Sequence, residues 1–441
     1  MTKMFFTFAL LFATTSLWSQ VEPSATGGGD LNDLHMMTPP PVSGDAYPVS
    51  VGAETRSNYV SGGMVFTAAY ISDLLLQNGA RSHADETYSF LPTIDFNRHT
   101  PRQAESLYYS SGFTLYQDTT ELNGVSQNAS AGYSFHLSPY AVIEVRDSFS
   151  QNYNFYNQGN PFSNGGVSGT PGTTGTVLIA PFENQLGNTS SAALEYQYGK
   201  NAMVGGTGSF SFLRYSDNSQ SQGLSDGNTT SATGFYSRRI APSEYVGVMY
   251  QFSRFVTHPI DTDTRTQTVF GFYTHYFTRS FSLSLLAGPE RYITLSSVAP
   301  APASWTPAVQ ASVGWQALKW NASANYSRIV SGAGGLVGSY DSDLGALSAQ
   351  LLLSRNWTVG ASGQYATFSN ASPAAVLISP GGHTLAGTAY LQHRISSKLH
   401  FEAGYSHFHQ GYASIPGIAS SPDSNRVYAS IGYGFNRPLG R

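Results

Sequence analysis

The chain has 441 residues and a formal net charge of −4, and only 11% of its residues are charged, less than half the share of about a quarter in globular domains. Cysteine is absent, which excludes a disulfide scaffold, thiolate metal ligands and a lipid-modified N-terminal cysteine. The basic residues are scattered rather than clustered, so nothing indicates nucleic acid as a partner. Aromatic residues at 13% and hydrophobic residues at 41% suit a wall that alternates between lipid and water.

The N-terminal part of the chain has the composition of export and linker segments. Residues 1–19 predict a signal peptide, because a basic start precedes an apolar stretch and Ser19 stands at a plausible cleavage point. Residues 20–58 contain a triglycine and a triproline and lack hydrophobic periodicity. This composition predicts a flexible periplasmic segment rather than a folded domain.

From Tyr59 onward the dominant pattern is a strict alternation of apolar with polar or small residues. The clearest example is Asn425–Phe435, in which every second residue from Val427 is apolar. Such alternation over about ten residues predicts a β-strand, and this length suits a tilted strand that crosses a bilayer. No later stretch holds about 18 consecutive apolar residues, so a transmembrane helix is not expected.

The connections between the alternating stretches alternate in length, a short one being followed by a long one. This pattern predicts an all-β, antiparallel up-and-down transmembrane β-barrel with short periplasmic turns and long extracellular loops. Counting each short turn as one hairpin predicts about 18 strands over residues 59–436, with 16 strands as the alternative and 437–441 as a C-terminal tail. The short connections lie at 138–139, 199–200, 241–243, 278–280, 318–319, 355–356 and 396–398, and the longest outer loop is 156–190.

The placement of aromatic residues gives an independent check on this interpretation. Trp357 and Tyr365 share one face of a predicted strand and are eight residues apart, which corresponds to about 20 Å of membrane depth. Trp320 and Tyr245 follow short turns, where an aromatic girdle at the periplasmic interface is expected.

Several charged residues fall on the faces that we expect to line the lumen. Charges on the inner wall of a wide barrel set the field that selects solutes. The alternative is that they are solvated wall residues or structural cross-strand pairs. One pair, Arg394 and Glu402, flanks a short turn and is expected to meet across neighbouring strands. The candidate lumen-facing residues are Glu144, Arg146, Glu195, Arg394 and Glu402.

No motif in the sequence predicts catalysis or a bound cofactor. There is no nucleophile elbow, no metalloprotease motif and no phosphate-binding loop. His407 and His409 share a face near the outer rim, but no third ligand stands nearby, so a metal site is not expected. We therefore predict a protein that is not an enzyme and that holds no cofactor or metal.

Three short segments, 86–93, 380–383 and 437–441, resemble an uncharacterised group of outer-membrane β-barrel porins from acidobacteria-like bacteria. The resemblance covers most of the chain after the linker and implies the same barrel architecture. Similar barrels are associated with exopolysaccharide export, so the resemblance also implies a saccharide as a substrate class. It transfers no site residues.

The functional hypothesis is a porin-like channel in the bacterial outer membrane for passive passage of hydrophilic solutes. A related version is an exopolysaccharide export conduit that meets a periplasmic partner through residues 20–58. Aromatic residues such as Tyr390 and Tyr428 in a line on the inner wall would favour the conduit, and a charged constriction would favour the general porin. The alternative is a structural or surface-adhesion barrel with a closed lumen. Expected partners are outer-membrane lipid, lipopolysaccharide and the barrel-assembly machinery.

Overall fold

The computed structural model of the chain describes residues 58–73, 84–152, 185–215, 225–258, 262–278, 280–296, 302–317, 319–332, 339–371, 381–412 and 423–439. The predicted signal peptide, 1–19, and almost all of the segment 20–58 lie outside these residues. Within them, no helix is long and apolar enough to cross a membrane.

The described residues form eighteen strands and one short 3-10 helix, η1 at Thr120–Leu122. The strands are β1 Tyr59–Ile71, β2 Asp85–His99, β3 Gln103–Tyr116, β4 Gly124–Ser138, β5 Ala141–Asn152, β6 Gln185–Gln197, β7 Ala202–Tyr215, β8 Asp226–Ala241, β9 Glu244–His258, β10 Thr262–Thr278, β11 Phe281–Ser296, β12 Ser304–Gln316, β13 Trp320–Gly332, β14 Ser339–Leu352, β15 Trp357–Asn370, β16 Gly382–Arg394, β17 Leu399–Tyr412 and β18 Asp423–Pro438.

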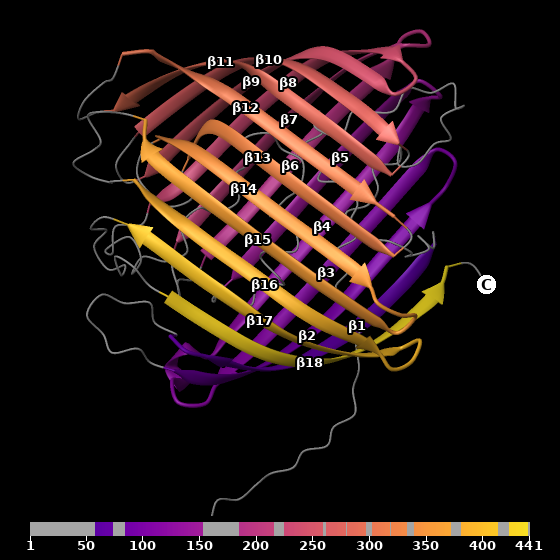
Figure 1. Ribbon diagram of the computed structural model, residues 1–441, viewed down its shortest axis with the longest axis vertical. Helices are drawn as coiled ribbons and strands as arrows, with labels where there is room; N and C mark the ends of the chain where they lie inside the picture. Colours follow the sequence, from indigo (N-terminus) through magenta and orange to yellow (C-terminus); the bar gives the residue numbers. More distant parts are fainter. Residues whose placement is uncertain are drawn as a thin grey trace, which may run out of the picture.

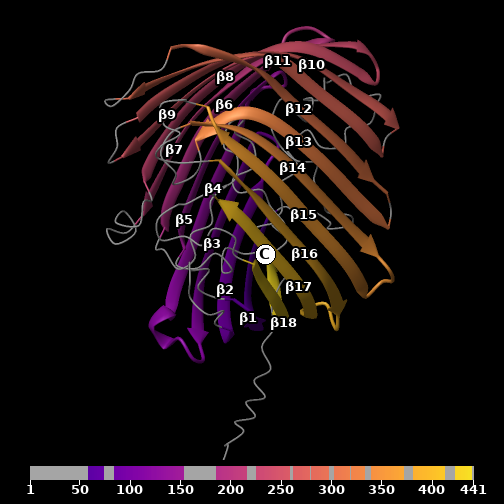
Figure 2. The ribbon, with the colours of Figure 1, turned by 60° about the vertical axis from the view of Figure 1, so that its left-hand side comes forward.

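Each strand pairs antiparallel with its neighbours in sequence, and the last strand closes the sheet against the first. The closing register pairs Tyr59 with Pro438 and Ile71 with Arg426, so β18 is paired along all of β1. Figures 1 and 2 show the strands running obliquely around one wall. The prediction of an antiparallel up-and-down barrel with 18 strands is confirmed.

The two faces of the wall differ as the alternation predicts, and β10 shows this most clearly. Thr262, Thr264, Thr266, Thr268 and Thr274 are at most 5% exposed, whereas the large apolar residues at alternate positions of the same strand are exposed. Those residues, Val269, Tyr273 and Phe277, are 51%, 36% and 54% exposed. Because the sheet is closed, the exposed apolar face is the outside and the polar face is the inside.

One end of the barrel carries the tight turns. Gly199, in the turn between β6 and β7, has a positive φ of 80°. Glycine adopts this conformation without steric strain because it has no Cβ atom. β18 ends on this side of the barrel (Figure 1). The backbone N–H of Leu439 donates to the carbonyl oxygen of Asn58 at 2.7 Å, so the chain just beyond β18 is tied to the start of β1.

The sheet opens locally between β12 and β13. Their pairing begins only at Val309 and Arg328, so the outer end of β13 has no backbone partner on β12. Glu290 of β11 reaches this gap, and the backbone N–H of Val330 donates to its carboxylate at 3.0 Å. The Glu290 carboxylate thus replaces the backbone carbonyl that β12 would otherwise offer to this N–H group.

The aromatic expectations are confirmed in part. Trp357 and Tyr365 are 39% and 49% exposed on the outer face, as predicted. Trp320 contacts Trp315, with ring centroids 3.8 Å apart. The prediction for Tyr245 is wrong, because this side chain is 1% exposed and packs with Met203 inside the barrel. The reason is register, because the outward positions of β9 have even numbers, as at the exposed residues Val248 and Tyr250.

Candidate functional site

The inner wall of the barrel is the candidate functional surface, and hydroxyl groups cover much of it. Many of these hydroxyls meet a second hydroxyl directly opposite on the neighbouring strand, as in the register of β10 with β11. Such cross-strand pairs stabilise a sheet while leaving a polar, uncharged lining. The pairs are Ser89–Thr114 at 2.9 Å, Ser209–Ser231 at 2.6 Å, Thr274–Ser284 at 2.6 Å, Ser323–Ser348 at 2.7 Å and Thr388–Ser406 at 3.0 Å.

Three of the candidate residues come together on β5 and β6. Glu144 and Arg146 alternate with the exposed Val145, and an Arg146 Nη2–Glu144 Oε1 distance of 2.5 Å joins them as an ion pair. Glu195 lies opposite Val142 on β6 and is therefore diagonal to Glu144. The three residues form a patch of one guanidinium and two carboxylates, which we call the β5–β6 charge patch.

The other two candidates are not paired with each other. Arg394 lies opposite His400, and its Nε donates to the carbonyl oxygen of Ser396 in the turn at 3.3 Å. Glu402 lies opposite Gln392, two positions farther along the ladder. The expected ion pair between Arg394 and Glu402 is therefore wrong, because the register offsets the two side chains and the turn backbone binds the guanidinium.

Glu402 instead belongs to a polar and aromatic cluster on the inner wall of β14–β18. The hydroxyl of Tyr428 donates to Glu402 at 3.0 Å, and the Arg426 guanidinium lies 5.1 Å from the centre of the Tyr428 ring. Gln350 donates to the hydroxyl of Tyr390 at 3.4 Å. Sequence reasoning missed Arg426, although it alternates with the exposed Val427 and this parity could have placed it inside.

Tyr390 and Tyr428 lie in one row that crosses four strands. Gly360 is opposite Tyr390, Tyr390 is opposite Gly404, and Gly404 is opposite Tyr428. A Cβ atom on Gly360 would come within 2.2 Å of the Tyr390 ring, and one on Gly404 within 2.5 Å of the Tyr428 ring. Both rings therefore lean over a neighbouring glycine, along the wall.

An apolar belt across β9–β13 departs from the uniformly polar inner wall that the sequence suggested. Its six residues are almost fully buried, and Phe270 and Ala308 are 0% exposed. The signal in the sequence is the stretch Val269–Tyr273, where apolar residues or glycine occupy both faces of the strand. At this level the side chains pack against one another and replace the polar hydroxyl lining that the rest of the inner wall carries. The belt consists of Met249, Phe270, Phe272, Leu286, Ala308 and Ile329.

His407 and His409 lie on the outer face of β17 at its outer end, as their spacing predicts. The Nδ1 atom of each ring donates one hydrogen bond to an oxygen on β18, His407 to Oδ1 of Asn425 at 3.0 Å and His409 to Oδ1 of Asp423 at 2.8 Å. The His383 ring lies 5.3 Å from that of His409. Across the residues that the structure describes, no group of three histidine or acidic side chains is arranged to hold a metal.

Comparison with known proteins found matches among solved structures, all of low similarity. No family model matches the chain, and no curated protein matches it. Among solved structures, OccK2 (OpdF) of Pseudomonas aeruginosa has a TM-score of 0.44 at 11% identity, over 87% of this chain and 100% of that one. OpdO of Pseudomonas aeruginosa has a TM-score of 0.42 at 14% identity, over 86% and 97%. The ferric-catecholate import receptor Fiu of E. coli K12 has a TM-score of 0.42 at 10% identity, over 86% and 82%.

Proposed function

We propose that the protein is a porin-like channel of the bacterial outer membrane that lets hydrophilic solutes pass passively. The observation behind this proposal is the contrast between the two faces of a closed 18-stranded wall. The outer face exposes large hydrophobic side chains such as Leu347 at 66%, whereas the inner face carries paired hydroxyls and paired charges. A wall of this size leaves an aqueous channel in a bilayer.

The β5–β6 charge patch is the proposed selectivity element of this channel. Glu144 and Arg146 neutralise each other, and Glu195 adds a second carboxylate beside them. A net negative patch raises the local concentration of cations. We therefore propose a weak preference for cations.

A saccharide conduit is the second candidate, and the row of Tyr390 and Tyr428 favours it. Two aromatic rings on one level of the inner wall, with Glu402 and Arg426 beside them, offer apolar faces and polar groups together. A sugar ring also combines a flat apolar face with hydrogen-bonding groups, so it would be complementary to this part of the wall. The saccharide conduit is the same channel as in the first proposal, with a saccharide as its substrate class.

Single-channel conductance of the refolded protein in a planar bilayer tests the channel. We expect steady ohmic steps with a reversal potential that favours cations in a salt gradient. Soluble oligosaccharides, added to one side, should interrupt the current if the saccharide version holds. Insertion without conductance would contradict the channel and favour a surface barrel with a closed lumen.

A further inference from the structure

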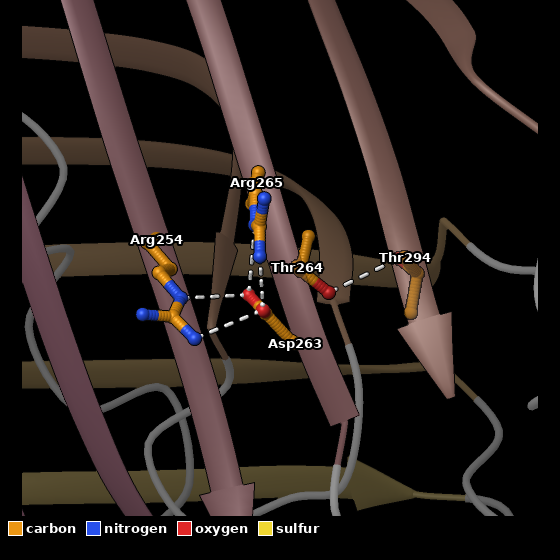
Figure 3. A network of polar contacts seen from close by, with 5 residues as sticks. All are labelled: Arg254, Asp263, Thr264, Arg265 and Thr294. Carbon is orange, nitrogen blue, oxygen red and sulfur yellow. Dashed lines mark hydrogen bonds and ion pairs between the residues drawn. The ribbon is translucent and has the colours of Figure 1, made fainter. Parts of the chain in front are cut away.

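A network of charged side chains lies on the outer face of β9 and β10, toward the outer ends of these strands (Figure 3). The carboxylate of Asp263 accepts two hydrogen bonds from Arg254, both at 3.0 Å, and two from Arg265, at 2.8 and 3.4 Å. Arg254 and Arg265 are directly opposite in the register of the two strands. One carboxylate thus holds two guanidinium groups side by side.

The network faces away from the inside of the barrel. Asp263 and Arg265 alternate with the buried Thr262, Thr264 and Thr266 of the inner face. Figure 3 shows Thr264 turned away from the network toward Thr294 of β11, at 3.0 Å. The arginine side chains are 47% and 45% exposed, so each guanidinium keeps an accessible edge.

A third arginine lies on the next strand at nearly the same level. Arg291 of β11 is opposite Gln267 and therefore diagonal to Arg265, at a separation of about 7–8 Å between backbones. Three guanidinium groups and one carboxylate leave two positive charges on adjacent strands. Two of the three guanidinium groups are already fixed in orientation, which lowers the entropy lost when an anion binds.

Large exposed apolar side chains surround this charge, which argues for an amphipathic ligand. Trp305 is opposite Arg291 and is 66% exposed, and Leu295 is opposite Asp263 and is 39% exposed. Below them on β10, Val269 is 51% exposed. A soluble anion would gain nothing from these neighbours, whereas a lipid would place acyl chains on them and its headgroup on the arginines.

We propose that Arg254, Arg265 and Arg291 bind the phosphate groups of a phosphorylated glycolipid of the outer leaflet, of the lipid A type. Arginine is the residue that matches phosphate oxygens through paired N–H groups. Asp263 holds two of the arginines in register without neutralising the site. The inference rests on the proposed outer-membrane location but not on conduction through the lumen.

Native mass spectrometry of the full folded chain in detergent tests the site. The probes are bisphosphorylated lipid A, its dephosphorylated form and inorganic phosphate. We expect wild type to retain the bisphosphorylated lipid, and the double variant Arg254→Gln/Arg265→Gln to bind it at least about tenfold more weakly. The matched control is Arg98→Gln, which removes an arginine from the outer face of β2 near the turns and should leave binding unchanged.

A second variant separates a lipid site from a structural network. Asp263→Asn keeps both arginines, retains in its Oδ1 one acceptor that can orient them, and adds net positive charge, so it should retain or strengthen lipid binding. Loss of binding in folded Asp263→Asn, equal binding of the dephosphorylated lipid, or displacement by inorganic phosphate at the lipid concentration would each overturn the proposal. Conductance of the double variant should equal that of wild type, so a failed lipid test and a failed channel test give different results.

Discussion

The ring of Phe435 on β18 lies directly across Gly62 of β1, at the seam where the last strand closes on the first. The two residues are opposite each other in the ladder, and a Cβ atom on Gly62 would come within 2.6 Å of the ring. The aromatic side chain therefore occupies the space that the glycine leaves free. This contact joins two strands that are more than 350 residues apart in sequence.

The same arrangement recurs at five other cross-strand positions. In each, an aromatic ring or an imidazole is directly opposite a glycine and lies where a glycine Cβ would be. Rings that cover glycines in this way restore the packing that a missing side chain would forfeit. The pairs are Gly205–Phe235, Gly247–Phe272, Gly360–Tyr390, Gly404–Tyr428 and Gly411–His383.

We predict that Gly62→Val destabilises the closed barrel by about 1–3 kcal/mol, because the added side chain displaces the Phe435 ring. Urea unfolding in detergent micelles, followed by heat-modifiable electrophoretic mobility, measures this change. Gly208→Val is the control, since a Cβ at Gly208 meets no atom within 4 Å. Its free energy of unfolding should change by less than about 0.5 kcal/mol. Equal losses in the two variants would mean that the seam contact does not contribute.

The fold was predictable because one local rule, alternation with period two, repeats along most of the chain from Tyr59 onward. Val427 and Ile431 of β18 are exposed and Ser430 is buried, as the pattern alone predicts. Where the pattern is uninformative, prediction fails. Tyr245 stands next to a turn. A shift of the strand register by one residue there moves a side chain from the lipid face to the inside, and the composition of the turn does not determine the register.

Long-range side-chain relationships were not predictable, because they depend on register between strands rather than on spacing within one. The distance in sequence between Arg394 and Glu402 suggested a pair, yet the ladder sets them two positions apart. The grouping of Arg254 with Arg265 follows only from the pairing of β9 with β10. Such groupings require the three-dimensional structure.

We predict that Glu290→Ala destabilises the barrel by about 1–3 kcal/mol, because the backbone N–H of Val330 would lose its acceptor in a buried site. Thr266 and Thr268 also hydrogen-bond this carboxyl group and would lose a partner. Glu290→Gln retains an acceptor oxygen and should keep most of the stability. Urea unfolding of the two variants side by side provides the measurement, and a Gln variant as unstable as the Ala variant would contradict the capping role.

We predict that replacing either member of the ion pair between Glu144 and Arg146 shifts ion selectivity, in opposite directions for the two residues. Arg146→Gln removes the positive charge beside Glu144 and should increase cation preference, whereas Glu144→Gln removes the negative charge beside Arg146 and should decrease it. One unit charge about 10 Å from a permeating ion contributes roughly 0.4 kcal/mol in water, about a twofold change in the permeability ratio. Reversal potentials in a tenfold salt gradient measure this ratio.

The control for this measurement is Arg98→Gln, because Arg98 pairs with Glu105 on the outer face and should not affect permeating ions. The double variant Glu144→Gln/Arg146→Gln should return the selectivity to near the wild-type value. Shifts of the same sign in the two single variants would show that the β5–β6 charge patch does not face the ion path.

We predict that Trp305 and Trp315 mark the two boundaries of the lipid-exposed band. They lie on the outer face of β12 at 66% and 44% exposure and are ten residues apart. At about 3.3 Å per residue and a tilt near 40°, their separation along the membrane normal is about 25 Å, which matches the apolar band of an outer-membrane barrel. In single-tryptophan variants, both residues should be quenched most strongly by lipids brominated near the headgroup.

The matched control is Leu285→Trp in a tryptophan-free background, since Leu285 lies opposite Ala311, at mid-depth between the two boundaries. This tryptophan should be quenched most strongly by lipids brominated near the end of the acyl chain, and aqueous acrylamide should hardly affect it. A Leu285→Trp variant that acrylamide quenches freely would place this face in water. In that case the exposed apolar face would not be a membrane surface, and the outer-membrane location would be refuted together with the channel.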